Sequence, residues 1–151
     1  MISMPEIGIR WQRFDQLSAG TLYELLRFRQ AIFVVEQGSP YPDLDGLDQS
    51  AWHLLLRGDG GLAGYLRLLP APPSFRIGRV AVAAELRGRG FGRRLMEEAL
   101  GFCREHYPGQ TVVLTAQAHL VPLYCGFGFE PTGEPFDDFG VAHIDMELRH
   151  S

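Results

Sequence analysis

The chain has 151 residues, of which 46% are apolar and 21% charged, and its net charge is −4. These proportions are typical of a globular domain large enough to bury its own core, and they exclude a disordered chain. No apolar run reaches the ~20 residues that span a bilayer, and residues 1–10 lack a signal-peptide pattern. We expect a single domain over residues 1–151, located in the cytoplasm, with neither a membrane nor a nucleic acid as partner.

The first third of the chain predicts a strand, a helix and a loop. Residues 9–14 alternate weakly between apolar and polar, which favours a strand. Apolar residues then recur at helical spacing over residues 19–33, with Ser18 or Thr21 available as the N-cap. The segment 37–50 is rich in proline, glycine and aspartate and is expected to form an ordered loop.

The middle of the chain predicts a hairpin, because two apolar runs flank a glycine-rich turn at residues 58–61. Further strands and helices follow in alternation. The hairpin strands are expected at 52–57 and 62–69. The other expected elements are strands at 75–82, 111–116, 129–132 and 143–148, and helices from Phe91 to Cys103 and from Leu120 to Cys125. This order predicts an α+β fold with a mixed, mostly antiparallel sheet flanked by helices.

The two cysteines, Cys103 and Cys125, lie in apolar stretches and form no C-x-x-C pair. We interpret them as reduced thiols of the core rather than as a disulfide framework. The acidic segment 43–48 (DLDGLD) lacks the spacing of a calcium loop, so no metal is expected.

A turn with three alternating glycines joins the strand ending at Val82 to the helix beginning at Phe91. Glycine lets backbone N–H groups converge on one point, and the first turn of a helix has N–H groups without partners. The helix dipole adds partial positive charge, so this turn predicts a phosphate site. Four arginines in eight residues strengthen the case for a small anionic ligand: Arg87, Arg89, Arg93 and Arg94.

Two familiar phosphate motifs do not fit this turn. A P-loop ends in G-K-[ST], which is absent, and a dinucleotide fold needs G-x-G-x-x-G and an acidic residue about 20 positions later. The spacing here is G-x-G-x-G, and Val112 and Val113 stand where the acidic residue would be. A tight turn with a solvated arginine cluster is the purely structural alternative.

The turn resembles the acyl-CoA motif of the GNAT superfamily, [RQ]-x-x-G-x-[GA], which Arg87, Gly90 and Gly92 match. The resemblance implies that backbone amides wrap the pyrophosphate of acetyl-CoA and that the preceding strand pairs with its pantetheine arm. The residues so implied are Gly88, Arg89, Gly90, Phe91, Gly92 and Arg93 with Arg87 in the turn, and Val80, Ala81 and Val82 in the strand.

A second signature of the same superfamily, L-Y-x-x-x-G-F, is matched by Leu123, Tyr124, Gly128 and Phe129. The resemblance implies that Tyr124 lies near the thioester sulfur and protonates the departing thiolate. A phenol, with a pKa of about 10, suits that role. The alternative is a core tyrosine whose hydroxyl is bonded to the backbone.

Nearly the whole chain is similar to the ElaA-like subfamily of GNAT proteins. The segments that carry the similarity are 33–37 (FVVEQ), 40–48 (PYPDLDGLD), 116–120 (AQAHL) and 143–146 (HIDM). Ser39 departs from relatives that often have cysteine there. The similarity implies a single GNAT domain and acetyl-CoA as the donor, but it leaves the acceptor undefined; a homodimer is also common among relatives.

These observations favour an N-acetyltransferase that moves the acetyl group of acetyl-CoA to a primary amine of a small molecule or peptide by direct attack. A backbone N–H at residues 80–82 would stabilise the oxyanion. Glu36, His119 and His143 are the candidates for the base, and the sequence does not choose among them. The acidic clusters at 43–48 and 137–138 either rim the cleft and favour a cationic acceptor or are solvated surface charge. The alternative function is a non-catalytic acyl-CoA-binding or sensing module.

Overall fold

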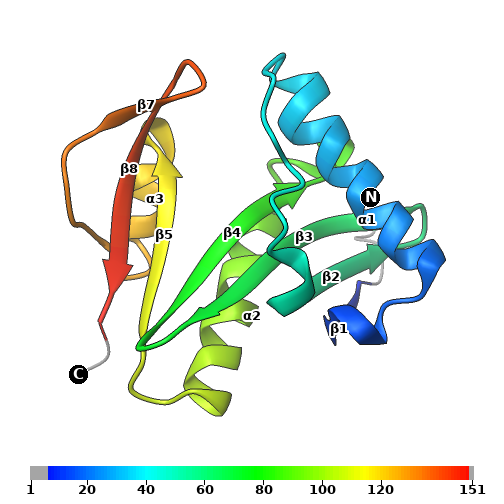
Figure 1. Cartoon of the computed structure of the whole chain (residues 1–151), viewed down its shortest axis with the longest axis horizontal. Helices are drawn as coiled ribbons and strands as arrows, with labels where there is room; N and C mark the ends of the chain where they lie inside the picture. Colours follow the sequence, from blue (N-terminus) through cyan, green and yellow to red (C-terminus); the bar gives the residue numbers. More distant parts are fainter. Residues whose placement is uncertain (1–6, 150–151) are drawn as a thin grey trace.

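The computed structural model describes residues 7–149, and within them eight strands form one sheet (Figure 1). The strand order is β1-β2-β3-β4-β5-β8-β6, with β7 also paired to β8. Only β4 and β5 pair in parallel among these strands. The strands are β1 (Gly8–Arg13), β2 (Trp52–Gly58), β3 (Gly61–Ala71), β4 (Ser74–Val82), β5 (Thr111–Gln117), β6 (Glu130–Pro131), β7 (Phe136–Asp138) and β8 (Val141–Leu148). The predicted fold class is confirmed.

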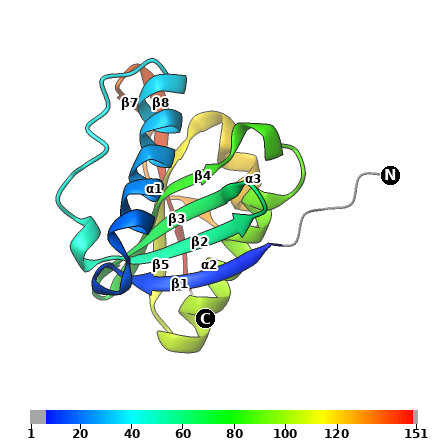
Figure 2. The ribbon, with the colours of Figure 1, turned by 90° about the vertical axis from the view of Figure 1, so that its right-hand side faces the viewer.

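Helices cover both faces of this sheet: α1 (Ala19–Gln30) packs on one face and α2 (Phe91–His106) on the other (Figure 2). Side chains alternate accordingly, so Leu54 faces α2 while Leu55 faces α1. A third, short helix, α3 (Val121–Cys125), lies on the side of α2 (Figure 1). Both faces of the central strands are therefore buried, which explains why β2 and β3 are near-continuous apolar runs.

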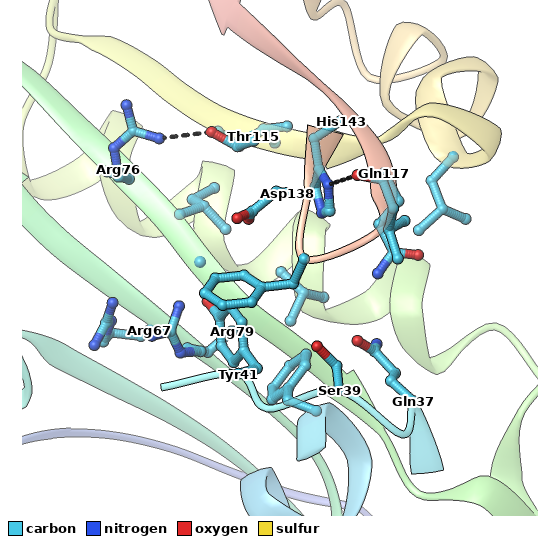
Figure 3. A pocket seen from close by; sticks show the side chains of 18 of the residues that line it. Gln37, Ser39, Tyr41, Arg67, Arg76, Arg79, Thr115, Gln117, Asp138 and His143 are labelled. Atoms are coloured by element: carbon cyan, nitrogen blue, oxygen red, sulfur yellow. Dashed lines mark hydrogen bonds between the residues drawn. The ribbon is translucent and has the colours of Figure 1, made fainter. Parts of the chain in front are cut away.

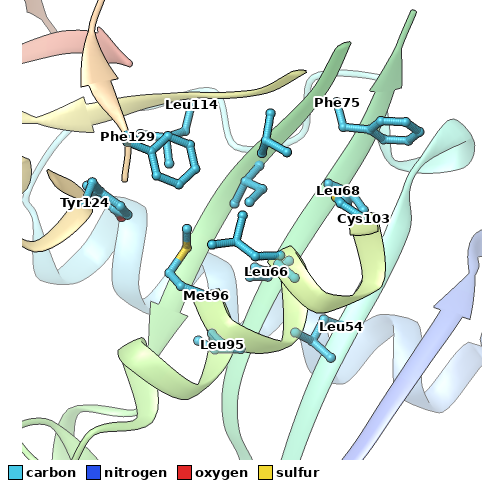
Figure 4. Packing of buried hydrophobic residues seen from close by; sticks show 14 of the residues in the cluster. Leu54, Leu66, Leu68, Phe75, Leu95, Met96, Cys103, Leu114, Tyr124 and Phe129 are labelled. Carbon is cyan, nitrogen blue, oxygen red and sulfur yellow. The ribbon is translucent and has the colours of Figure 1, made fainter. Parts of the chain in front are cut away.

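The larger core lies between α2 and the sheet (Figure 4). The buried face of α2 is a stripe of apolar residues at helical spacing. Its fully or nearly buried members are Phe91, Leu95, Met96, Ala99, Leu100 and Cys103. Opposite them lie apolar side chains of β2 to β5, among them Leu66 and Leu114. This core fixes the N-terminus of α2 relative to the end of β4.

The first helix begins as the sequence predicts, with the Ser18 Oγ accepting a 3.1 Å hydrogen bond from the Thr21 N–H. Its α-helical part ends at Gln30, and a π-helical segment continues over Ala31–Glu36. The chain then enters the loop at 37–48, which returns across the sheet.

Strands β4 and β5 diverge along their length, which opens the sheet in a V (Figure 1). They pair only where residues 74–77 meet residues 111–114. A bulge in β4 accompanies the divergence: Tyr65 of β3 lies opposite Ala81, whereas Arg67 lies opposite Gly78. Within the bulge Arg79 has a φ of 54°, a left-handed conformation uncommon outside glycine. Beyond the bulge, the edge of β4 that faces β5 pairs with no strand of residues 7–149.

Two details differ from the sequence-based expectations. Strand β7 at Phe136–Asp138 is not predicted, because its three residues carry no run long enough to signal a strand.

Cys125 is exposed, so its assignment to the core is wrong; it ends a helix of five residues whose buried member is Tyr124. Cys103 is buried as predicted, and burial raises the pKa of its thiol to about 11. No helix in the described residues is long and apolar enough to cross a membrane.

Candidate functional site

A cavity of about 410 Å³ occupies the V between β4 and β5 (Figure 3). It passes through the sheet, because Tyr124 belongs to the core on the α2 side while Thr115 and His143 lie on the opposite face. The loop after α1 and strand β7 close its other sides. Of the residues predicted for the site, Tyr124, His143 and Val80 line this cavity; Glu36 and His119 do not.

Strand register aligns polar side chains along the wall of the cavity. Thr115 of β5 lies opposite Asp145 of β8, and Gln117 lies opposite His143. Their neighbours Leu114, Ala116 and Met146 face the α2 core, so the polar set faces the other way.

Hydrogen bonds link the first of these pairs to β4. Arg76 donates from Nη1 to the Thr115 Oγ1 at 3.1 Å, and Thr115 donates to the Asp145 Oδ1 at 2.6 Å. The alternation of apolar and polar residues in β5 and β8 indicates which side chains share a face of the sheet. Only the pairing of the strands shows that the side chains of Arg76, Thr115 and Asp145 meet.

His143 is held in an orientation that suits a proton acceptor. Its Nδ1 lies 2.8 Å from the backbone oxygen of Val141, which can only accept, so the neutral ring donates from Nδ1. The Nε2 lone pair is then the one available for a proton. Phe136 of β7 stacks on the ring, with centroids 6.2 Å apart.

Tyr124 enters the cavity from α3 and is 7% exposed. Its ring meets Phe129 edge-on at 6.2 Å between centroids, and burial raises the pKa of its phenol. Over the described part of the chain its hydroxyl forms no hydrogen bond, contrary to the alternative of a core tyrosine anchored to the backbone. A buried, protonated phenol at this position can act as an acid.

The glycine turn presents free backbone amides. Gly88 and Gly90 have φ values of 79° and 87°, and Gly90 is the N-cap of α2 without any side-chain cap. The first helical hydrogen bond runs from the Arg94 N–H to the Gly90 oxygen at 3.0 Å. The N–H groups of residues 91–93 therefore have no helical partner. A Cβ added at either glycine, or at Gly92, would meet no atom within 4 Å, so the turn is open and fits a diphosphate.

Arg87, the first residue of the motif, is engaged with Glu36 of the π-helical segment. Their side chains form a bidentate ion pair, with Arg87 Nη2 at 2.7 Å from Glu36 Oε2, and Arg87 Nε also donates to the Val82 oxygen at 3.1 Å. The hydrogen bond from Arg87 lowers the pKa of Glu36. Glu36 is thus both outside the cavity and a weakened base.

His119 also lies apart from the cavity. It is exposed on the helical turn at Ala118–Leu120, and the N-cap of α3 is Leu120. His119 thus neither lines the cavity nor caps α3.

Two arginines that line the cavity, Arg67 and Arg79, belong to a buried network of arginines and aspartates. Arg29 of α1, which is 0% exposed, donates from Nε to Asp43 at 3.0 Å and from Nη1 to Asp48 at 2.7 Å. Arg67 binds Asp48 at 3.1 Å and Asp45 at 2.8 Å. The interpretation of this acidic cluster as surface charge is wrong for Asp43 and Asp48, which are buried.

Arg79 extends this network to the bulge in β4. Its Nε donates to the Asp43 Oδ1 at 2.9 Å and its Nη2 to Asp45 at 3.2 Å. The guanidinium also lies over the ring of Tyr41, 4.9 Å from the centroid. The network thereby ties α1 and the loop to the residue of β4 that has the left-handed conformation.

Sequence reasoning misses this network, although part of the signal is present. Arg29 follows Leu25 by four residues and so shares the buried face of α1. Arg67 follows Tyr65 by two residues and so faces the same side of β3. Two arginines at inward positions beside an acidic loop indicate buried ion pairs. Within the described residues, no group of three metal-ligating side chains comes together.

Comparison with known proteins agrees with this architecture. The family model described as an acetyltransferase (GNAT) domain matches residues 34–150. The UPF0039 protein sll0451 of Synechocystis is 43% identical over 150 residues, covering 95% of this chain and 96% of that protein. Protein ElaA of Escherichia coli is 41% identical over 145 residues, covering 91% and 95%.

Solved structures give the same result. The crystal structure of Escherichia coli ElaA matches with a TM-score of 0.91 at 39% identity, covering 95% of this chain and 100% of that one. An acyl-CoA N-acyltransferase from Pseudomonas aeruginosa matches with a TM-score of 0.90 at 36% identity, covering 95% and 99%. The chain therefore belongs to the GNAT acetyltransferase family and resembles its ElaA and UPF0039 members.

Proposed function

We propose that the protein is an N-acetyltransferase that transfers the acetyl group of acetyl-CoA to a primary amine in a ternary complex. Membership of the GNAT family and the acyl-CoA N-acyltransferase of similar structure support acyl transfer. The observation that carries the finer proposal is the cavity in the V, which holds Tyr124 and His143 beside the unpaired edge of β4.

The donor would bind along the unpaired edge of β4 and the turn that follows it. The free amides of residues 91–93, with partial positive charge from α2, would hold the pyrophosphate. Backbone groups of residues 80–82 have no partner on β5 and would pair with the amides of the pantetheine arm. This arrangement would direct the thioester into the cavity, where Val80 and Tyr124 both contribute to the lining.

In the reaction, the amine nitrogen bonds to the thioester carbonyl carbon, and the carbon–sulfur bond breaks. A backbone N–H of the strand around Val80 would stabilise the negative charge on the carbonyl oxygen. Tyr124 would donate its phenolic proton to the leaving thiolate, since burial keeps the phenol protonated. His143 would take the ammonium proton at Nε2, because its Nδ1–H is bonded to Val141.

Three observations favour His143 over the other candidate bases. His143 lines the cavity, whereas His119 is exposed elsewhere. Glu36 is bound by Arg87, and its pKa is lowered. The Nδ1–H of His143 donates to the Val141 oxygen, which leaves Nε2 of the ring as the atom that accepts a proton.

The direct test is release of free thiol from acetyl-CoA in the presence of polyamines, aminoglycosides, amino acids and peptides. We expect release that depends on an amine and a loss of rate in His143→Gln. The exposed His119→Gln serves as the matched control and should keep the wild-type rate. Binding of coenzyme A without amine-dependent thiol release would identify a binding or sensing module instead.

A further inference from the structure

The cavity contains charges that its own side chains do not neutralise. Among its lining arginines, Arg67 and Arg79 are paired with aspartates of the buried network. Arg76 is exposed and, among residues 7 to 149, forms no ion pair; its Nη1 bonds only to the neutral hydroxyl of Thr115. Asp138 of β7 also lines the cavity and has no ion-pair partner in the same part of the chain. Within the described residues, one unpaired cation and one unpaired anion therefore face the cavity.

The two charges are separated along the cavity, as Figure 3 shows. Asp138 and His143 come from β7 and β8, while Arg76 and Thr115 lie nearer the closed end of the V, where β4 and β5 are paired. The proton acceptor is thus on the side of the carboxylate. A ligand that places an ammonium beside Asp138 would present that nitrogen to His143.

Aromatic side chains form the mouth of the cavity. Phe136 and Phe139 are 43% and 49% exposed, which is unusual for residues of this size. Tyr41 meets Phe139 edge-on, with centroids 5.6 Å apart, and lies near Phe33. These rings provide apolar surface that a ligand can cover.

We propose that the amine acceptor is a free α-amino acid with an apolar or aromatic side chain. Arg76 binds its carboxylate through the N–H groups that it does not donate to Thr115, and Asp138 receives its ammonium before His143 removes a proton. The aromatic mouth covers its side chain. The charge of Arg76, which no carboxylate in residues 7 to 149 pairs, disfavours polyamines and other purely cationic acceptors. This inference rests on the proposed function, since it assigns the acceptor of that reaction.

The test measures acceptor binding apart from turnover. Calorimetry on the protein saturated with coenzyme A compares L-phenylalanine with L-phenylalaninamide and phenethylamine, which keep the amine and ring but lack the carboxylate. We expect L-phenylalanine to bind about tenfold tighter than either analogue. Arg76→Gln should remove that preference by weakening L-phenylalanine alone. Arg149→Gln changes an exposed arginine paired with Glu147 and should leave it intact.

The outcomes separate this inference from the proposed function. Equal binding of the three ligands, no binding of any, or an unchanged preference in Arg76→Gln would overturn the amino-acid assignment. Amine-dependent thiol release with any other acceptor of the panel would still support acetyl transfer in those cases. If L-phenylalanine binds through Arg76 but no amine causes thiol release, the ligand class stands and the transferase proposal fails.

Discussion

Replacing Asp43 by asparagine tests whether the buried network holds the loop and the bulge of β4 in place. The side chain of Asp43 is 8% exposed and accepts from Arg29 at 3.0 Å and from Arg79 at 2.9 Å. Three guanidinium groups and three carboxylates balance each other in this network. Asparagine keeps the shape but removes one negative charge, so a net positive charge remains beside the fully buried Arg29.

The cost follows from the partners that remain. Breaking a buried ion pair by removing one partner costs about 3–5 kcal/mol. Arg29 retains Asp48 at 2.7 Å and Arg79 retains Asp45 at 3.2 Å, so we expect a loss near the lower bound, about 3 kcal/mol. For a domain of this size, that loss lowers Tm by roughly 6–12 °C.

Urea unfolding followed by tryptophan fluorescence gives the free energy of unfolding and its slope with denaturant. Asp59→Asn, at an exposed position of the hairpin turn, is the matched control and should lie within about 0.5 kcal/mol of the wild type. An Asp43→Asn protein that is as stable as this control would refute the account of the network.

Further predictions concern acid stability, the proposed acid, the phosphate turn and the thiols. Burial raises the pKa of Asp45, but hydrogen bonds from Arg67 and from the backbone N–H of Leu47 outweigh burial and lower that pKa to about 2. This value lies below the unfolded pKa of about 3.9. The stabilisation that Asp45 provides is therefore full above pH ~4 and disappears as the pH falls through 2. Urea midpoints should therefore drop less from pH 5 to pH 2 in Asp45→Asn than in the wild type. Tyr124→Phe should lower kcat for thiol release by about 10²-fold with little change in acetyl-CoA affinity, and an unchanged kcat would remove Tyr124 as the acid. Gly90→Val should weaken coenzyme A binding by about tenfold or more in calorimetry, because valine is strained at a φ of 87° and covers the free amides. A thiol reagent should modify Cys125 in the folded protein and Cys103 only after unfolding; rapid modification of both would contradict the burial of Cys103.

Much of the fold can be predicted from local signals. The apolar stripe of α2, the Ser18 cap of α1 and the glycine turn of the hairpin each depend on residues close together in sequence. Their physical causes are equally local, namely helical periodicity, an unpaired N–H and a turn that glycine can adopt. The turn before α2 is predictable for the same reason.

The cavity could not be predicted in the same way, because pairing between distant strands creates it. Arg76 and Thr115 are 39 positions apart and meet only because β4 and β5 pair in parallel and then diverge. Charge alone also misleads: Asp43 and Asp48 look like surface residues until Arg29 is seen to lie beneath them. Among the candidate bases, Glu36 could not be ruled out from the sequence. The structure shows that it lies outside the cavity and is bound by Arg87.

The most direct measurement of the central claim is an amide NMR titration of the protein with coenzyme A. If the turn holds the diphosphate, the largest shift changes will fall on the amides of residues 90–93 and 80–82, and Gly90→Val will require about tenfold more coenzyme A, or more, to produce them. Gly133→Ala, at an exposed glycine without a positive φ, should leave them unchanged. Saturable binding whose shift changes avoid both segments, or no binding at all, would contradict the claim.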